Sequence, residues 1–317
     1  MEHVFGLSDN KIGAAIQYFR ESYGITQGKL CKGLCSIATL SRIEAGERDA
    51  DSLLLETLLE RLGRMPNQFE LILTDFDYLI YVNREEITNQ IKERNLDKAE
   101  ELLLEYEHVA ASKGNAHMQF IIYSKALMNE LQGGEVDETL NLLMDAISCT
   151  VPEFKAHRIK DYYLSNNEIG IIIDIIQYML LGGLIDWAKE ILGQIIEYLE
   201  LQALSEENNL IYAKVTVLAG RLYLQEGHAL KAKEMCDKGI ERSKGSRKMD
   251  YLGDLYYLKA KTIEELFDKN VSMDTRREEC VKNYIRAYHI YNICEERSSS
   301  DMIKNYLQEE YQWADID

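Results

Sequence analysis

Residues 25–48 of the chain read ITQGKLCKGLCSIATLSRIEAGER, and this stretch predicts two short helices joined by a tight turn. Thr26 can cap the first helix, because its hydroxyl can accept a hydrogen bond from a free backbone N–H. Ser36 can cap the second helix in the same way, and we expect that helix to run to Glu44. Gly46 follows, and glycine readily adopts the left-handed conformation that ends helices. The stretch therefore has the form of a helical hairpin.

The second helix of this hairpin would leave small side chains and one arginine facing solvent. Leu40 and Ile43 recur at helical spacing and should point inward. The open face then carries Ile37, Ala38, Thr39, Ser41 and Arg42. Such a helix suits the major groove of DNA, because bulky side chains near its start would block entry. The alternative is a hairpin that serves only packing or protein binding.

The stretch resembles the helix-turn-helix of Cro/repressor-type domains. The matching residues are Thr26, Gln27, Leu30, Ser41, Arg42, Ile43, Glu44 and Gly46. The turn over residues 33–36, Gly-Leu-Cys-Ser, is one residue shorter than the commonest form and is similar to that of the Rgg/PlcR-type peptide-responsive regulators. The resemblance implies binding of double-stranded DNA through the second helix.

We expect the residues that contact DNA to lie on this hairpin and directly after it. Thr39 and Arg42 are placed to reach bases or phosphates, while Gln27 and Lys29 should steady the preceding helix on the DNA backbone. Glu44 should face the body of the domain. The full set of expected DNA-contacting residues is Gln27, Lys29, Ser36, Ala38, Thr39, Ser41, Arg42 and Arg48.

The composition of the 317-residue chain predicts an almost wholly helical protein with more than one domain. The apolar fraction is 46%, which is ample for a core, and only two prolines occur, Pro66 and Pro152. The longest apolar run, residues 169–185, contains Asp174 and is too short to span a membrane. No charged segment followed by an apolar run opens the chain, so we expect a cytoplasmic protein.

Six scattered cysteines and six histidines indicate neither a disulfide framework nor a metal site. Cys31 and Cys35 lie one helical turn apart, but no nearby histidine or second pair completes a zinc site. Reduced thiols agree with a cytoplasmic location. No phosphate-binding glycine loop and no nucleophile–base signature is present. We therefore expect no enzymatic activity, no metal and no cofactor.

The charge of the chain is strongly acidic but unevenly distributed. Of the net charge of −18, residues 1–66 carry −1 and the remaining residues carry −17. Residues 26–48 carry a net charge of +2. One copy should therefore hold DNA weakly, and a homodimer would double the phosphate contacts. The acidic remainder should repel DNA and disfavours a long wrapped interface.

Beyond residue 75 the chain repeats a pattern of a long helix followed by a shorter one. The shorter helices contain LDKAEELL, VDETLNLL, IDWAKEIL and ALKAKEMC, which align at Ala99, Thr139, Ala188 and Ala232. The spacings are 40, 49 and 44 residues, and small residues at these places would let antiparallel helices approach closely. The unit resembles an irregular, lengthened tetratricopeptide repeat. A fifth pair over residues 250–295 and a capping helix over residues 302–313 complete the pattern.

These features predict an all-α chain in three segments. Residues 1–65 would form a five-helix DNA-binding domain of the Cro/repressor type. Residues 66–74, which begin with a proline, would form a hinge. Residues 75–317 would form an irregular tetratricopeptide-like superhelix of about five helix pairs and a C-terminal capping helix.

In a repeat superhelix the first helix of each pair would line the concave face. The candidate peptide-binding residues on these helices are Gln177, Lys214, Arg221, Tyr257 and Lys261. Amide side chains could pair with the backbone of an extended peptide, and lysine or arginine could hold its carboxylates. Salt bridges to neighbouring acids are the other explanation for Lys214 and Arg221.

The whole arrangement, a short-turn helix-turn-helix followed by irregular repeats, resembles the Rgg/PlcR-type regulators over its full length. The resemblance implies a homodimeric, cytoplasmic transcription factor whose repeats bind a short signalling peptide that is secreted and reimported, as in quorum sensing. The competing interpretation is that the repeats are only a dimerisation or protein-docking scaffold, without a peptide ligand. Gln27 and Arg42 disfavour a helical adaptor that has lost DNA binding.

Overall fold

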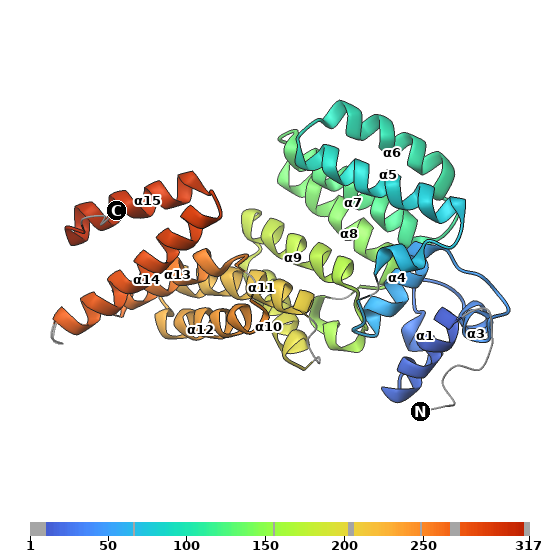
Figure 1. Cartoon of the computed structure of the whole chain (residues 1–317), viewed down its shortest axis with the longest axis horizontal. Coiled ribbons are helices and arrows are strands. Elements are labelled where there is room, and N and C mark those ends of the chain that lie inside the picture. Colours follow the sequence, from blue (N-terminus) through green and yellow to red (C-terminus); the bar gives the residue numbers. More distant parts are fainter. Residues whose placement is uncertain are drawn as a thin grey trace. The chain divides into compact units, whose positions relative to one another are not determined.

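The computed structural model describes residues 11–65, 67–154, 156–201, 206–247, 249–266 and 273–313. The regular elements within these residues are all helices, fifteen α-helices and two short 3-10 helices. The chain divides into two compact units, Met1–Ala203 and Leu204–Asp317, and each unit is described by itself (Figure 1). No helix in the described part of the chain is long and apolar enough to cross a lipid bilayer.

The first unit begins with four short α-helices that share one small core. They are α1 (Lys11–Ser22), α2 (Gln27–Leu30), α3 (Ile37–Glu44) and α4 (Ser52–Arg61). The fully buried side chains between them include Ile16, Leu30, Leu40, Ile43 and Leu58. The 3-10 helix η1 (Gln68–Leu71) is the fifth helical element, and it lies beyond residue 65. The hinge was expected to begin at Pro66, which lies outside the described residues.

Local capping explains where the two central helices of this segment begin and end. The hydroxyl of Thr26 accepts a hydrogen bond from a backbone N–H in the first turn of α2. Ser36 does the same for α3, with a donor–acceptor distance of 3.1 Å. Gly46, after the end of α3, has a φ angle of +74°. The caps and the stop that the sequence predicts are therefore confirmed.

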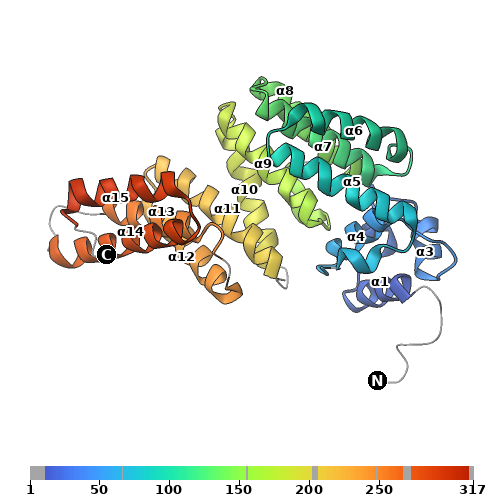
Figure 2. The same ribbon diagram turned by 45° about the horizontal axis from the view of Figure 1, so that its top comes forward.

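Three helix hairpins complete the first unit. They are α5 (Asp75–Lys92) with α6 (Leu96–Ala110), α7 (Asn115–Leu131) with α8 (Val136–Thr150), and α9 (Asn166–Leu181) with α10 (Ile185–Leu201). Figure 1 shows α5 to α8 as a stack, and α9 packs beside α8, as Figure 2 also shows. The 3-10 helix η2 (Ala156–Asp161) packs on α10. Ala99, Thr139 and Ala188 are at most 1% exposed, which confirms the predicted register of the repeats.

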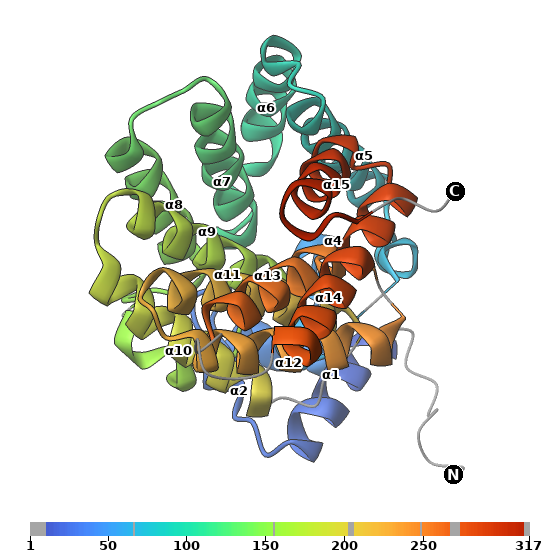
Figure 3. The same ribbon diagram turned by 90° about the vertical axis from the view of Figure 1, so that its left-hand side faces the viewer.

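The second unit is built from the last five α-helices. They are α11 (Glu206–Gln225), α12 (Ala229–Ser246), α13 (Leu252–Glu265), α14 (Met273–Ile293) and α15 (Arg297–Tyr311). Ala232 of α12 is fully buried, as the repeat pattern predicts. Helix α14 packs against both α13 and α15 (Figure 3). The predicted capping helix is present as α15, but it begins earlier than expected, at Arg297.

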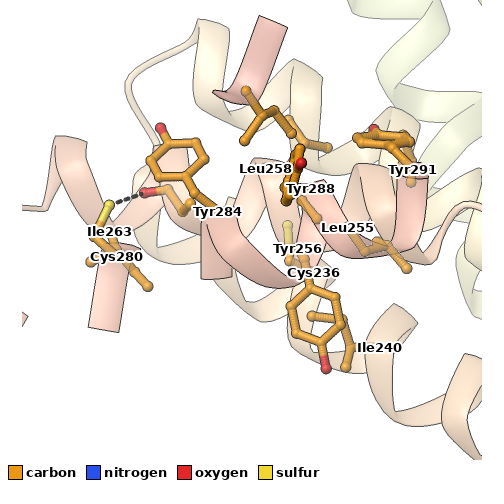
Figure 4. Close-up of a cluster of buried hydrophobic side chains, with 14 of the residues drawn as sticks. Cys236, Ile240, Leu255, Tyr256, Leu258, Ile263, Cys280, Tyr284, Tyr288 and Tyr291 are labelled. Carbon is orange, nitrogen blue, oxygen red and sulfur yellow. Dashed lines mark hydrogen bonds between the residues drawn. The ribbon is translucent and has the colours of Figure 1, made fainter. Parts of the chain in front are cut away.

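The core of the second unit is unusually rich in tyrosine. Tyr256, Tyr284, Tyr288 and Tyr291 lie among leucine, isoleucine and cysteine side chains (Figure 4). Buried tyrosines need a partner for their hydroxyl groups, because an unpaired polar group inside a protein costs free energy. The core therefore includes tyrosine hydroxyl groups that need hydrogen-bond partners, and it is not purely apolar.

One carboxylate satisfies several of these hydroxyls at the C-terminal end of the unit. Glu264 accepts hydrogen bonds from Tyr284, Tyr306 and Tyr311 at 2.7, 2.8 and 2.6 Å, and from Lys261 at 3.3 Å. Burial alone would raise the pKa of Glu264, but the tyrosine hydrogen bonds and Lys261 hold this pKa below its usual value. The donors come from α13, α14 and α15, so this carboxylate fastens α15 to the repeats.

Candidate DNA-binding site

The surface of α3 divides into a buried and an open face. Leu40 and Ile43 are fully buried. The exposed residues from its cap to its last turn are Ser36, Ile37, Ala38, Ser41 and Arg42, and Thr39 is half-buried. The division predicted from helical spacing is therefore confirmed, and the open face carries one isoleucine, small side chains and one arginine.

Glu44, at the end of α3, fixes this helix to its neighbours. Its carboxylate accepts hydrogen bonds from Arg20 Nε at 2.6 Å and Nη2 at 2.8 Å, and from Gln27 Nε2 at 2.7 Å. Arg20 and Glu44 are 9% and 5% exposed, so the pair is well shielded from water. Glu44 thus faces the domain, as predicted. The side-chain amide of Gln27 donates to Glu44, so part of its hydrogen-bonding capacity is used within the protein. Arg20 was not predicted, since no local pattern connects it with Glu44.

The basic side chains of the predicted site remain available on the surface. Lys29, Arg42 and Arg48 are exposed, and none forms an ion pair with another described residue. Arg48 Nη1 lies 3.4 Å from the hydroxyl of Thr39, which in turn lies 2.9 Å from the hydroxyl of Ser36. These groups form a polar row at the start of α3, where a phosphate or a base edge could accept hydrogen bonds.

A hollow of about 320 Å³ lies beside this polar row. Cys35, Ser36 and Thr39 line it from the helix-turn-helix, Lys113 lines it from the turn after α6, and Asn115 lines it from the start of α7. The start of the predicted recognition helix is therefore next to the repeats, which sequence patterns did not indicate.

The turn between α2 and α3 rests directly on the repeats. Gly33 has a φ of +80°, and a Cβ atom at this position would collide with the carbonyl oxygen of Thr150 at the end of α8. Asn115 Nδ2 donates a hydrogen bond to the carbonyl of Gly33 at 2.6 Å. Glycine is therefore required at position 33 for its backbone conformation and for the close approach of α8.

The candidate peptide-binding residues are distributed over both units. Gln177 is a half-buried residue of α9 in the first unit, while the other four lie on α11 and α13, which pack against each other in the second unit. Arg221 donates to Asp254 at 2.6 Å, and Lys261 donates to Glu264 at 3.3 Å.

The remaining two candidates also have partners. The Tyr257 ring lies 5.9 Å from that of Tyr284, and Lys214 has a partner of its own. The salt bridge considered for Arg221 is present, and Arg221 and Lys261 are both paired with acids of the same unit.

Comparisons with known proteins also identify a helix-turn-helix in this part of the chain. Residues 16–66 match the helix-turn-helix family model HTH_3. A comparison with curated protein sequences finds no match.

Among solved structures, the chain is similar to Bacillus thuringiensis PlcR in complex with the peptide PapR7 and DNA. The identity is 17%, the match covers 93% of this chain and 99% of that chain, and the TM-score is 0.56. For PlcR of the same organism in its apo form, the identity is 16%, the coverage 93% and 98%, and the TM-score 0.57. The apo form of the competence regulator ComR from Streptococcus vestibularis is 16% identical, with coverage of 95% and 98% and a TM-score of 0.48. The expected all-α fold is confirmed over the helix-turn-helix and the repeats.

Proposed function

We propose that this chain, which has the fold of the PlcR-type helix-turn-helix regulators, is a cytoplasmic, sequence-specific DNA-binding regulator of transcription. The observation that supports this proposal is the open face of α3, where mostly small side chains, Ile37 and Arg42 lie opposite a fully buried face. A helix of this form fits the major groove. Lys29 and Arg48 would add phosphate contacts, because both are exposed cations beside this helix.

The proposal assigns a role to each of three segments of the chain. Residues 1–65 read DNA, residues 66–74 connect, and residues 75–317 act as the sensing and dimerising part. The proposed function is that of a transcription regulator rather than an enzyme, and it includes no catalytic step.

Selection of duplexes from a randomised DNA pool with the full-length protein tests DNA binding. We expect enrichment of a near-palindrome whose half-sites lie about one or more helical turns apart, because a two-fold dimer presents two recognition helices. Mapping of DNA bound in cells should return the same sequence. A pool that shows no enrichment would overturn the proposal.

We further propose a homodimer as the DNA-binding form. The support is electrostatic, since residues 26–48 of one copy carry a net charge of only +2 within a chain of −18. Two copies would double the phosphate contacts. Light scattering at micromolar concentration, with and without the selected duplex, measures the mass directly. A monomer under both conditions would contradict this part.

The repeats, we propose, bind a short signalling peptide, and peptide binding changes the affinity for DNA. PlcR, whose fold this chain shares, has been solved with a peptide and DNA. A ligand can shift DNA affinity only to the extent that it binds one conformation of the repeats better than another. Calorimetry with peptides encoded beside the gene, using Arg221→Ala and Lys214→Ala as variants, tests the site.

A second candidate function is a docking scaffold without a peptide ligand. The observation that favours it is the engagement of Arg221 by Asp254 and of Lys261 by Glu264. Binding of an acidic peptide would have to compete with these ion pairs. If the protein binds its operator with full affinity and no peptide encoded beside the gene changes that affinity, the scaffold becomes the better interpretation.

A further inference from the structure

Ile37 is a large apolar side chain in an unusual place. It is the first residue of α3, directly after the capping Ser36, and it is 56% exposed. The other isoleucines of this segment with a described burial, Ile12, Ile16, Ile25 and Ile43, are buried or half-buried in the core. Burial in the core therefore does not account for an isoleucine on the predicted DNA-reading face.

The side chain of Ile37 is nevertheless held in place. A Cβ atom built on Gly28 of α2 would lie 3.3 Å from Ile37 Cδ1, so the isoleucine lies over the glycine. Isoleucine is also restricted at χ1, because two heavy atoms branch from its Cβ. One side of Ile37 therefore rests against α2 while the other faces solvent.

The N-terminal residues of a recognition helix are the ones that reach base edges in the major groove. The bases offer hydrogen-bond donors and acceptors there, and one apolar group, the C5-methyl of thymine. An isoleucine has no hydrogen-bonding atom in its side chain, so contact with that methyl group is the base-specific contact that suits it.

We propose that Ile37 is a specificity-determining residue that reads the C5-methyl group of a thymine in each half-site of the operator. The inference rests on the proposed function, in which α3 enters the major groove. The packing of Ile37 over Gly28 sets the position of the isoleucine side chain. Burial of one methyl group corresponds to about a fourfold change in affinity.

The test uses the full-length protein and a duplex selected from a randomised pool. Each thymine of a half-site is replaced in turn by deoxyuridine, which removes the C5-methyl and leaves base pairing unchanged. For the wild type, we expect one position at which this replacement weakens binding about fourfold per half-site. Ile37→Ala should bind the thymine duplex more weakly and should no longer respond to deoxyuridine at that position.

Two further variants make the result specific. Leu104→Ala removes an equally exposed apolar side chain from α6 (60% exposed) and should retain the full response to deoxyuridine. Gly28→Ala retains Ile37 but adds a Cβ atom 3.3 Å from its Cδ1, which should displace the isoleucine. This variant should therefore show a smaller response to deoxyuridine. Circular dichroism confirms that each variant is folded.

The outcomes separate this inference from the function on which it rests. If the wild type selects a motif but no thymine replacement weakens binding, the inference is wrong and the DNA-binding function stands. The inference is also wrong if Ile37→Ala responds to deoxyuridine as strongly as the wild type. A protein that selects no motif at all would overturn both.

Discussion

Arg61 ends α4 and Glu168 lies in the first turn of α9, and their side chains form a bidentate ion pair with exposures of 3% and 0%. Arg61 Nε and Nη2 lie 3.1 and 2.5 Å from the two carboxylate oxygens. The same guanidinium donates to the backbone carbonyls of Leu30, Lys32 and Thr150 at 3.0, 2.8 and 2.9 Å. One arginine therefore binds the end of α2, directly before the turn into α3, to the repeat helices α8 and α9.

Removal of Arg61 should destabilise the protein strongly. Arg61→Met leaves the buried Glu168 carboxylate unpaired, and breaking such a pair costs roughly 3–5 kcal/mol of the free energy of unfolding. Urea denaturation measures the loss. Arg158→Ala breaks an exposed ion pair with Asp161 and should cost at most about 1 kcal/mol. The double variant Arg61→Met/Glu168→Leu should regain part of the loss, and equal stability of Arg61→Met and Arg158→Ala would refute the prediction.

The same ion pair predicts a pH dependence of stability. Burial alone would raise the pKa of Glu168, but Arg61 and hydrogen bonds to the carboxylate hold this pKa below its usual value of 4.5. A carboxyl group with a lowered pKa in the folded state stabilises the fold above its unfolded pKa, and this stabilisation is lost as the pH falls through the folded pKa. Thermal unfolding between pH 6 and pH 3 should therefore show a decline below about pH 4.5 that is weaker in Glu168→Gln. Glu101→Gln, an exposed control on α6, should follow the wild type.

Arg42 should contribute directly to operator affinity. It is exposed in the last turn of α3, and its removal should weaken binding to the selected duplex by roughly 1–3 kcal/mol. Fluorescence anisotropy at one fixed salt concentration measures the change, because phosphate contacts depend on salt. Lys98→Ala removes an exposed cation from α6 and should leave the affinity unchanged. A folded Arg42→Ala variant with wild-type affinity would remove this arginine from the interface.

Gly33 should tolerate alanine far less well than a glycine of similar backbone conformation. Both Gly33 and Gly133 have positive φ angles, +80° and +78°, so alanine costs about 1–2 kcal/mol in backbone strain at either position. A Cβ at Gly133 meets open space, whereas at Gly33 it collides with the Thr150 carbonyl. We expect Gly33→Ala to lose more stability than Gly133→Ala in urea and to bind DNA more weakly. Equal losses would show that the close approach to α8 is unimportant.

Glu264 should control how firmly α15 is attached. Glu264→Gln weakens the hydrogen bonds from Tyr306 and Tyr311, which lie on α15. Amide hydrogen exchange of α15 should therefore become faster, while exchange of α1 to α4 should not change. Glu265→Gln alters the exposed neighbouring carboxylate and serves as the control. Unchanged exchange in Glu264→Gln would mean that apolar contacts alone hold α15.

The features that the sequence predicted well are local or periodic. Thr26, Ser36 and Gly46 act through atoms within a few residues, and the buried positions Ala99 and Ala232 follow from a repeated spacing. Such signals do not depend on the tertiary structure, so the caps of α2 and α3, the stop after α3 and the repeat register were predictable, whereas the start of α15 was not.

The contacts that hold the DNA-binding helices on the repeats were not predictable in this way. Arg61 and Glu168 are separated by 107 positions, and no spacing rule joins them. The same holds for Arg221 and Asp254, whose ion pair depends on how α11 and α13 pack. Sequence patterns could therefore name charged candidates but not distinguish a ligand contact from an internal salt bridge.

The short turn at Gly33 has a consequence for protein engineering. A DNA-binding domain with the commoner, longer turn would change the backbone around Gly33, where a single added Cβ atom already collides with the Thr150 carbonyl at the end of α8. Whole-domain exchange with such a repressor would therefore yield a misfitted chimera. Operator preference is better transferred by grafting only the exposed side chains of α3 and retaining the host turn, so that the recipient keeps its attachment to the repeats.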